Sequence, residues 1–271
     1  MSDFDRNIST APFGQTISRP ETVAVDHGLR AYMLGIYNFM VIGLAITGLA
    51  ALGIYMVSVT SDPALAARNA TGAAYALRSG LFITPIGYYV FISPLKWVIM
   101  LSPLALVFVL SFGIERMRPA LGQVLFWVFA ALMGLSLGSV FMVFTQTSIV
   151  RVFFITAASF GALSLWGYTT QRDLTGMGSF LMMGLFGVIL ASLVNLFMAS
   201  SALQFVISVV GVLVFAGLTA WDTQRLKNDY LYAAMDEEAA ERTSILGALS
   251  LYLNFINLFT LLLQLLGQRD E

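Results

Sequence analysis

Seven long stretches of this chain are almost free of charged side chains, and this constrains its fold more than any other feature. A helix needs roughly 20 residues to cross the hydrocarbon core of a bilayer, and it satisfies its own backbone hydrogen bonds. The stretches approach that length and therefore predict membrane-spanning α-helices. The fourth is the shortest, and Arg151 stands at its edge. They cover residues 32–57, 97–114, 120–144, 152–168, 178–199, 203–222 and 246–267.

The composition agrees with a chain whose solvent is lipid. Hydrophobic residues make up 58% and charged residues 11% of the 271 residues, whereas soluble domains have about 45–50% and about 25%. We therefore predict an all-α membrane protein with seven transmembrane helices in one domain, residues 32–267. A polar N-terminal segment, residues 1–31, precedes this domain, and a short tail, residues 268–271, follows it.

The scarcity of reactive side chains excludes several classes of function. The chain has no cysteine and one histidine, His27, so thiol nucleophiles, His-containing catalytic triads and the H-E-x-x-H zinc site are ruled out. We find no nucleophile–base pair, and we predict neither an enzyme nor a bound cofactor. The net charge of −1 and the lack of a basic patch argue against a nucleic-acid partner. The partner that the sequence does imply is the lipid bilayer.

Basic residues are unevenly divided among the segments that connect the spans. With the N-terminus inside, the inner segments hold nine and the outer segments five of the 14 Lys and Arg residues. The positive-inside rule then predicts a cytoplasmic N-terminus and an external C-terminus in an inner (plasma) membrane. The inner set is Arg6, Arg19, Arg30, Arg116, Arg118, Arg172, Arg225, Lys227 and Arg242, and the outer set is Arg68, Arg78, Lys96, Arg151 and Arg269.

The connection over residues 58–96 is too short and too interrupted by proline to cross the membrane. We expect it on the external side. Two interpretations stay open: an ordered loop that caps the bundle, or a segment that lies at the interface or re-enters the membrane. Within the spans, the pair Gly134-x-x-x-Gly138 is expected to let two helix backbones approach closely.

Polar residues at membrane depth are the best guide to function, because ionisable groups are costly there and mark pathways or switches. Asp222 closes the sixth span and is the leading candidate. The structural alternative is an ion pair with Arg225, three residues further along the same helix.

The seventh span carries a polar stripe. Asn254, Asn257 and Gln264 follow one another at spacings of 3 and 7, which places them on one side of a helix. The functional interpretation is that the stripe lines a polar pore. The alternative is hydrogen bonding between helices without any pathway, and the spacing alone does not separate the two.

Two further charged residues have ordinary explanations. Arg116 stands at the end of the second span, where an arginine by itself sets topology. Asp173 lies in a short turn before the fifth span, where we expect it to cap the helix or to interact with its dipole.

Three motifs carry a resemblance to a known family. They are Tyr168-Thr-Thr-Gln-Arg-Asp-Leu-Thr175, Phe215-Ala-Gly-Leu-Thr-Ala-Trp-Asp-Thr-Gln-Arg-Leu-Lys227 and Ala248-Leu-Ser-Leu-Tyr-Leu-Asn-Phe-Ile-Asn-Leu-Phe259. In these stretches the chain resembles the Bax inhibitor-1 (transmembrane Bax-inhibitor-motif) family, and its bacterial branch in particular. The resemblance runs from the third span to the C-terminus and is poor over the first 96 residues.

The resemblance implies a central last helix surrounded by the other six, and a pH-sensitive calcium leak with a stress-protective role. In the family, acidic residues on the sixth and seventh helices share a proton and gate the pore, and a second-helix arginine engages them. By this resemblance the sixth-helix acid is Asp222, which would also be the calcium ligand. The arginine is Arg116. The seventh-helix acid is replaced here by Asn254.

That replacement changes the expected chemistry. Two close carboxylates cannot both ionise cheaply and therefore share a proton. Asn254 cannot titrate, so Asp222 and Asn254 cannot form such a pair. The amide can still hydrogen-bond to Asp222, and its oxygen can ligate a hard cation.

Two functional hypotheses follow. The first is a pH-sensitive calcium (cation) leak channel, with gating around Asp222. The second is a regulatory membrane protein that binds a membrane protease or another membrane partner without carrying ions. The second draws on the polar N-terminal segment and on the acidic stretch Asp236–Glu241, which a solvated connecting loop explains equally well.

Overall fold

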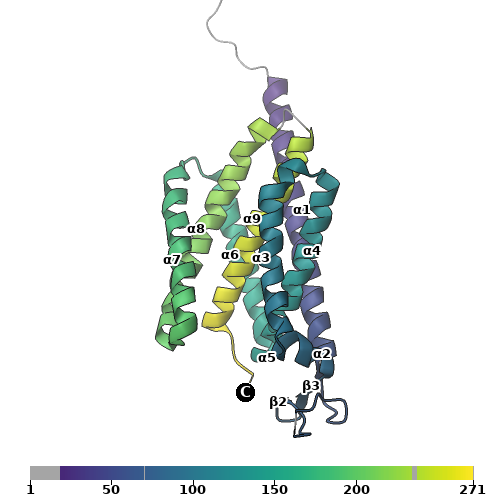
Figure 1. Ribbon diagram of the computed structural model, residues 1–271. Coiled ribbons are helices and arrows are strands. Elements are labelled where there is room, and N and C mark those ends of the chain that lie inside the picture. Colours follow the sequence, from purple (N-terminus) through teal and green to yellow (C-terminus); the bar gives the residue numbers. More distant parts are fainter. Residues whose placement is uncertain (1–18, 70, 234–236, 271) are drawn as a thin grey trace, which may run out of the picture.

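The computed structural model describes residues 19–69, 71–233 and 237–270, and within them the chain is a bundle of long helices (Figure 1). Seven of these helices are long and apolar enough to cross a membrane, which confirms the predicted fold class. The spanning helices are α1 (Arg19–Ser58), α3 (Leu95–Gly113), α4 (Pro119–Leu137) with the short α5 (Val140–Val143), α6 (Gln146–Thr169), α7 (Thr175–Met198), α8 (Ser201–Ala233) and α9 (Glu237–Leu266). We call the end of the bundle where α1 begins the upper end, as in Figure 1, and the opposite end the lower end.

The helices match the predicted spans, and most of them extend beyond the apolar runs. The fourth span, α6, has 24 residues and begins before Arg151, which lies inside it and is exposed. Glu237–Glu241 forms the first turns of α9 instead of a connecting loop, while Asp236 and residues 1–18 lie outside the described residues. Polar residues at the ends of a spanning helix can lie in the water at the membrane surface, so a helix can continue past its apolar run.

Helix α9 is the most buried of the seven spans. In its most apolar 18-residue window 67% of the residues are buried, against 39% or fewer in each other span. It packs against α1, α4, α6 and α8, whereas α3 packs mainly against α4, and α7 mainly against α8. Figure 1 accordingly shows α9 in the middle of the bundle, with α7 at its edge. The expected ring of six helices around one is thus seen for four of them.

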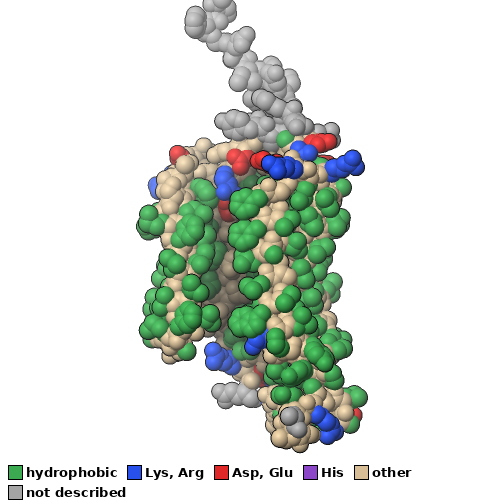
Figure 2. Space-filling model, viewed as in Figure 1, with side chains coloured by type: hydrophobic (Ala, Val, Ile, Leu, Met, Phe, Trp, Pro, Cys, Tyr) green, Lys and Arg blue, Asp and Glu red, His purple; other side chains and the backbone are tan. Residues whose placement is uncertain are grey.

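The sides of the bundle are apolar and its ends are charged. Figure 2 shows hydrophobic side chains over the face in view, with acidic and basic side chains gathered at the upper and lower ends. Exposed residues such as Phe112, Phe180 and Phe197 would be unfavourable in water and are suited to lipid. The same view shows a hollow that runs along the face between α8 and α3, which we call the α3–α8 hollow.

The lower end carries a small sheet that the sequence did not predict. Strands β1 (Val59–Thr60), β2 (Ala76–Arg78) and β3 (Leu81–Ile83) form an antiparallel sheet in the order β1-β3-β2. The turn of α2 (Pro85–Gly87) and the π-helical turn Tyr88–Ile92 then lead into α3. The 58–96 connection therefore contains a small sheet and two short helical turns. Its position relative to the membrane surface stays a prediction. Strands of two or three residues are too short to leave a readable alternation in the sequence.

The C-terminal tail is attached to the same end. Gln268 donates its backbone N–H to Ser148 Oγ at 2.9 Å, and its carbonyl accepts from the Thr145 amide at 3.0 Å. Asp270 forms an ion pair with Arg78 of β2. These contacts attach the segment after α9 to the start of α6 and to the sheet at the lower end.

Candidate functional site

The candidate site lies where the upper halves of α8 and α9 pack together. Asp222 on α8 is 4% exposed and Asn254 on α9 is 5% exposed. On α9, Ser250 stands one helical turn before Asn254, so both side chains lie on the same face. That face meets Asp222.

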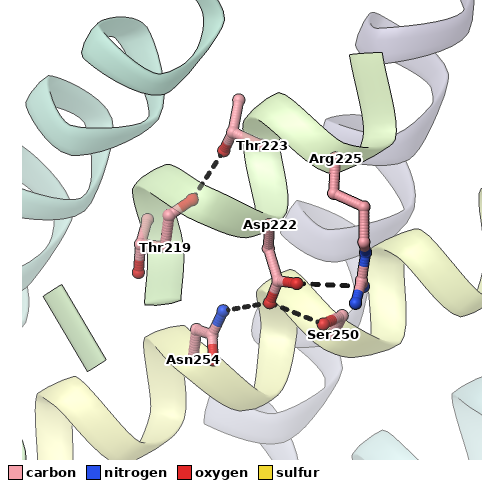
Figure 3. Close-up of polar contacts among 6 residues, drawn as sticks. All are labelled: Thr219, Asp222, Thr223, Arg225, Ser250 and Asn254. Atoms are coloured by element: carbon pink, nitrogen blue, oxygen red, sulfur yellow. Dashed lines mark hydrogen bonds and ion pairs between the residues drawn. The ribbon is translucent and has the colours of Figure 1, made fainter. Parts of the chain in front are cut away.

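The Asp222 carboxylate is held by three side chains (Figure 3). Its Oδ2 atom accepts a hydrogen bond from Ser250 Oγ at 2.7 Å and another from Asn254 Nδ2 at 2.7 Å. Its Oδ1 atom lies 2.9 Å from Arg225 Nη2, an ion pair one turn along α8. Among the described residues Oδ1 has no hydrogen-bond donor in addition to this ion pair. The buried carboxylate therefore contacts two hydrogen-bond donors and one cation.

Arg225 stands at the boundary between this buried group and the upper surface. Its side chain is 41% exposed, whereas that of Asp222 is 5% exposed. The guanidinium lies over the Trp221 ring, 4.8 Å from its centroid, which stabilises that position. Arg225 therefore pairs with the buried carboxylate while part of its side chain remains exposed.

The structure does not bring Arg116 to Asp222. Arg116 ends the 3₁₀ turn Ile114–Arg116 after α3; it is exposed and makes no ion pair with any described residue. The physical reason is that α3 packs on α4, away from α8. The contact implied by the resemblance is not seen in this structure, whereas the Arg225 pair that served as the structural alternative is present. A sensing role of Arg116 stays a prediction.

The three residues of the predicted polar stripe on α9 contact different partners. Asn254 contacts Asp222, while Asn257 donates to the Leu253 carbonyl of its own helix at 2.8 Å. Gln264 Oε1 accepts from Gln204 Nε2 at 2.6 Å and from Ser208 Oγ at 3.0 Å, both on α8. The contact of Gln264 is the interhelical hydrogen bonding that was left open as the alternative. Whether the stripe lines a pore stays a prediction.

The residues at the site form no resident metal centre. In the described ranges there is no group of three or more His, Cys, Asp or Glu side chains that would hold a metal ion. Calcium takes six to eight oxygen ligands, and Asp222 offers one carboxylate.

The comparisons with known proteins agree with the motifs. A family model described as "Inhibitor of apoptosis-promoting Bax1" matches residues 29–271. The chain belongs to this family. The match begins in α1, so the likeness extends well before residue 96, contrary to the expectation from the sequence.

Bacterial relatives cover most or all of the chain. The inner membrane protein YbhL of Escherichia coli (strain K12) is 41% identical over 243 residues, which are 89% of this chain and 93% of YbhL. The uncharacterized protein RP147 of Rickettsia prowazekii is 41% identical over 271 residues, 100% of both chains. An uncharacterized protein of Borreliella burgdorferi is 48% identical over 160 residues, 59% of this chain and 69% of that protein.

The motifs of the Bax inhibitor family meet in space beside the site. Gln224 donates to the Arg172 carbonyl at 2.8 Å and accepts from the Leu174 amide at 2.8 Å. Lys227 Nζ donates to the Tyr168 carbonyl at 3.0 Å. The segment that follows Asp222 is therefore fixed to the turn between α6 and α7. The sequence analysis identified both motifs but not these contacts, because a sequence motif does not show which other segment it packs against.

The third motif supplies a buried anchor that sequence reasoning also missed. Tyr252 is fully buried, and its hydroxyl lies 2.6 Å from Thr47 Oγ1. Thr47 Oγ1 also lies 2.9 Å from the Gly43 carbonyl and 2.8 Å from the Ala130 carbonyl, either of which can accept its one hydroxyl proton. Since these residues belong to α9, α1 and α4, the contacts connect three helices two residues before Asn254. Ser250 was missed too, although its spacing of four from Asn254 was a usable signal.

Asp173 has the capping role that the sequence predicted. Its Oδ1 accepts the backbone N–H of Thr175, the first residue of α7, at 2.9 Å. Hydrogen bonds from the Thr175 side chain and then its amide hold the pKa of Asp173 below its usual range.

Proposed function

We propose that this chain is a pH-sensitive calcium (cation) leak of the inner membrane, with a stress-protective role, and that it gates around Asp222. One observation carries the proposal: an ionisable side chain, 4% exposed, lies within a membrane span and is bonded across the α8–α9 interface. Charged groups in spans are expensive to bury and are kept for function.

The contacts of Asp222 suggest what gating consists of. Protonation removes the negative charge that Arg225 pairs with and turns one acceptor oxygen into a donor. The bonds from Ser250 and Asn254 to Oδ2 are charge-assisted and weaken in the same step. The contact that they hold is between α8 and the most buried helix, α9, so its loss would change the packing at the centre of the bundle.

The α3–α8 hollow is the route that we propose for the ion. It runs beside α9 on the face where α3 does not pack on α8, and charged side chains stand at its upper end (Figure 2). An ion there would exchange its water for oxygens of Asp222 and its neighbours only briefly. Asn254 in place of a second acid leaves one negative charge fewer to retain the ion, which favours passage over storage.

The inner membrane is proposed from the relative YbhL, whose printed name is an inner membrane protein. The excess of basic residues at the upper segments favours a cytoplasmic upper end and an external lower end. In this orientation Arg225 faces the cytoplasm, so Asp222 would respond to cytoplasmic pH.

The test is calcium entry into liposomes that contain the purified chain and a trapped calcium dye, compared with empty liposomes from pH 6 to pH 8. We expect flux above the empty control. Arg225→Gln should alter its pH profile, because it removes the cation at Asp222. Arg118→Gln removes an exposed arginine at the same end of the bundle; it is the matched control and should leave the profile unchanged. Flux equal to that of empty liposomes at every pH would overturn the proposal.

A further inference from the structure

A long crevice separates α1 from α6. Its main cavity, about 760 Å³, is lined by residues of both helices and by Phe255 of α9. A cavity of about 330 Å³ adjoins it at the upper end and shares Tyr37 and Gly161 with it. A third of about 270 Å³ adjoins it toward the lower end and shares Gly48 and Phe255. The three cavities therefore follow one another along α1, each sharing lining residues with the next.

The length and lining of the crevice suit a hydrocarbon chain. Along α1 it runs from Arg30 to Leu52, about 33 Å at 1.5 Å per residue, which is close to the thickness of the hydrocarbon core, roughly 30 Å. The main cavity is lined by apolar side chains such as Met40, Leu49 and Phe160. Its volume lies within the range of small-ligand sites.

The upper end of the crevice is positively charged. Arg30 is exposed and lines the upper cavity, together with the hydroxyl-bearing Tyr37, Ser164 and Tyr168. The Lys227 ammonium group lies 5.3 Å from the Tyr168 ring centroid. Of the described residues that line the three cavities, none is acidic.

We propose that the α1–α6 crevice binds an anionic phospholipid, with one acyl chain along the crevice and the phosphate at Arg30. A phospholipid of the surrounding bilayer is the natural occupant, because the lining residues Val41 and Leu49 are themselves exposed, so that the crevice is open at the apolar side of the bundle. The phosphate complements the cations at the upper end, and the apolar lining accepts the chain. This inference does not depend on ion flux.

The head-group contact is tested by native mass spectrometry of the full chain in detergent. Phosphatidylglycerol, phosphatidylcholine with the same acyl chains, and the matching free fatty acid are titrated separately. We expect tightest binding of phosphatidylglycerol, and Arg30→Gln to weaken it by roughly fivefold, the effect of one basic residue near a lipid surface. Arg118→Gln, which removes an exposed upper-end charge outside the crevice, should change nothing. Equal affinity for the two phospholipids, or a fatty acid that binds as tightly, would overturn the inference.

The chain contact is tested by filling the crevice. A Cβ atom added at Gly161 meets nothing within 4 Å, and the same holds at Gly48 and at Gly187 of α7, which lies outside the crevice. Gly161→Leu should abolish retention of the lipid, and Gly187→Leu should not. If Gly161→Leu fails to fold, Gly48→Leu serves in its place. Retention equal to wild type in a folded crevice variant would contradict the proposal.

Discussion

Replacing Asn254 by aspartate places a second carboxylate against Asp222. Asn254 Nδ2 lies 2.7 Å from Asp222 Oδ2, and the variant would put an oxygen at that position. Two unit charges at this separation repel by about 6 kcal/mol at an effective dielectric constant of about 20, a value that Arg225 partly offsets. The cost is avoided when the two carboxylates share one proton.

The sign of the effect on stability follows from proton counting. Above about pH 5 the unfolded variant holds no proton on these groups, while the folded variant holds one. The free energy of unfolding should therefore decrease by about 1.4 kcal/mol for each pH unit over the range in which the proton is retained. For a chain of this size the melting temperature should fall by about 3–6 °C per pH unit relative to wild type.

The assay is thermal unfolding in detergent from pH 6 to pH 8, followed by intrinsic tryptophan fluorescence. The matched control is the double variant Asp222→Asn with Asn254→Asp, which restores one carboxylate and one amide at the same separation and should lose the additional slope. A single variant with the slope of wild type would refute the reasoning, and so would a double variant that keeps the slope.

Three further outcomes are expected from thermal unfolding. Gly134→Ala would place a Cβ 2.5 Å from the Thr47 carbonyl oxygen and should destabilise the α1–α4 contact by about 1–3 kcal/mol, whereas Gly161→Ala, in open space, should be nearly neutral. Tyr252→Phe removes the hydroxyl beside Thr47 and should cost about 0.5–1.5 kcal/mol; a melting temperature equal to wild type would count against this anchor. Asp173→Ala should lower stability at neutral pH, and the difference should vanish as the pH falls through the lowered pKa of Asp173. A difference that persists in acid would point to a cause other than the ionised cap.

The seven spans were predictable because the length and apolar character of a single segment are enough to identify a membrane-spanning helix. The fourth span shows the limit of this reasoning: its apolar run is short, yet α6 begins at Gln146, five residues before Arg151. The sheet at the lower end escaped prediction because its strands are only two or three residues long. Its β1–β3 pairing also joins segments that are distant in sequence, although β2 and β3 are joined by a tight turn.

The sequence identified two residues of the candidate site, but not most of the contacts that these residues make. Asp222 and Asn254 stood out because polar groups are costly at membrane depth, and they do meet. Arg116 was assigned through the resemblance, but which helix α3 packs against is decided by the whole bundle and cannot be seen in one segment. Arg225 needed no tertiary information, since i and i+3 residues are neighbours on any helix.

The central claim is that the charge of Asp222 controls a calcium leak, and the most direct measurement compares wild type with Asp222→Asn in dye-loaded liposomes from pH 6 to pH 8. The side chain keeps its shape and loses its charge. We predict that wild-type flux changes with pH across this range and that Asp222→Asn flux does not. The account is contradicted if both proteins show the same pH profile, or if neither passes more calcium than empty liposomes.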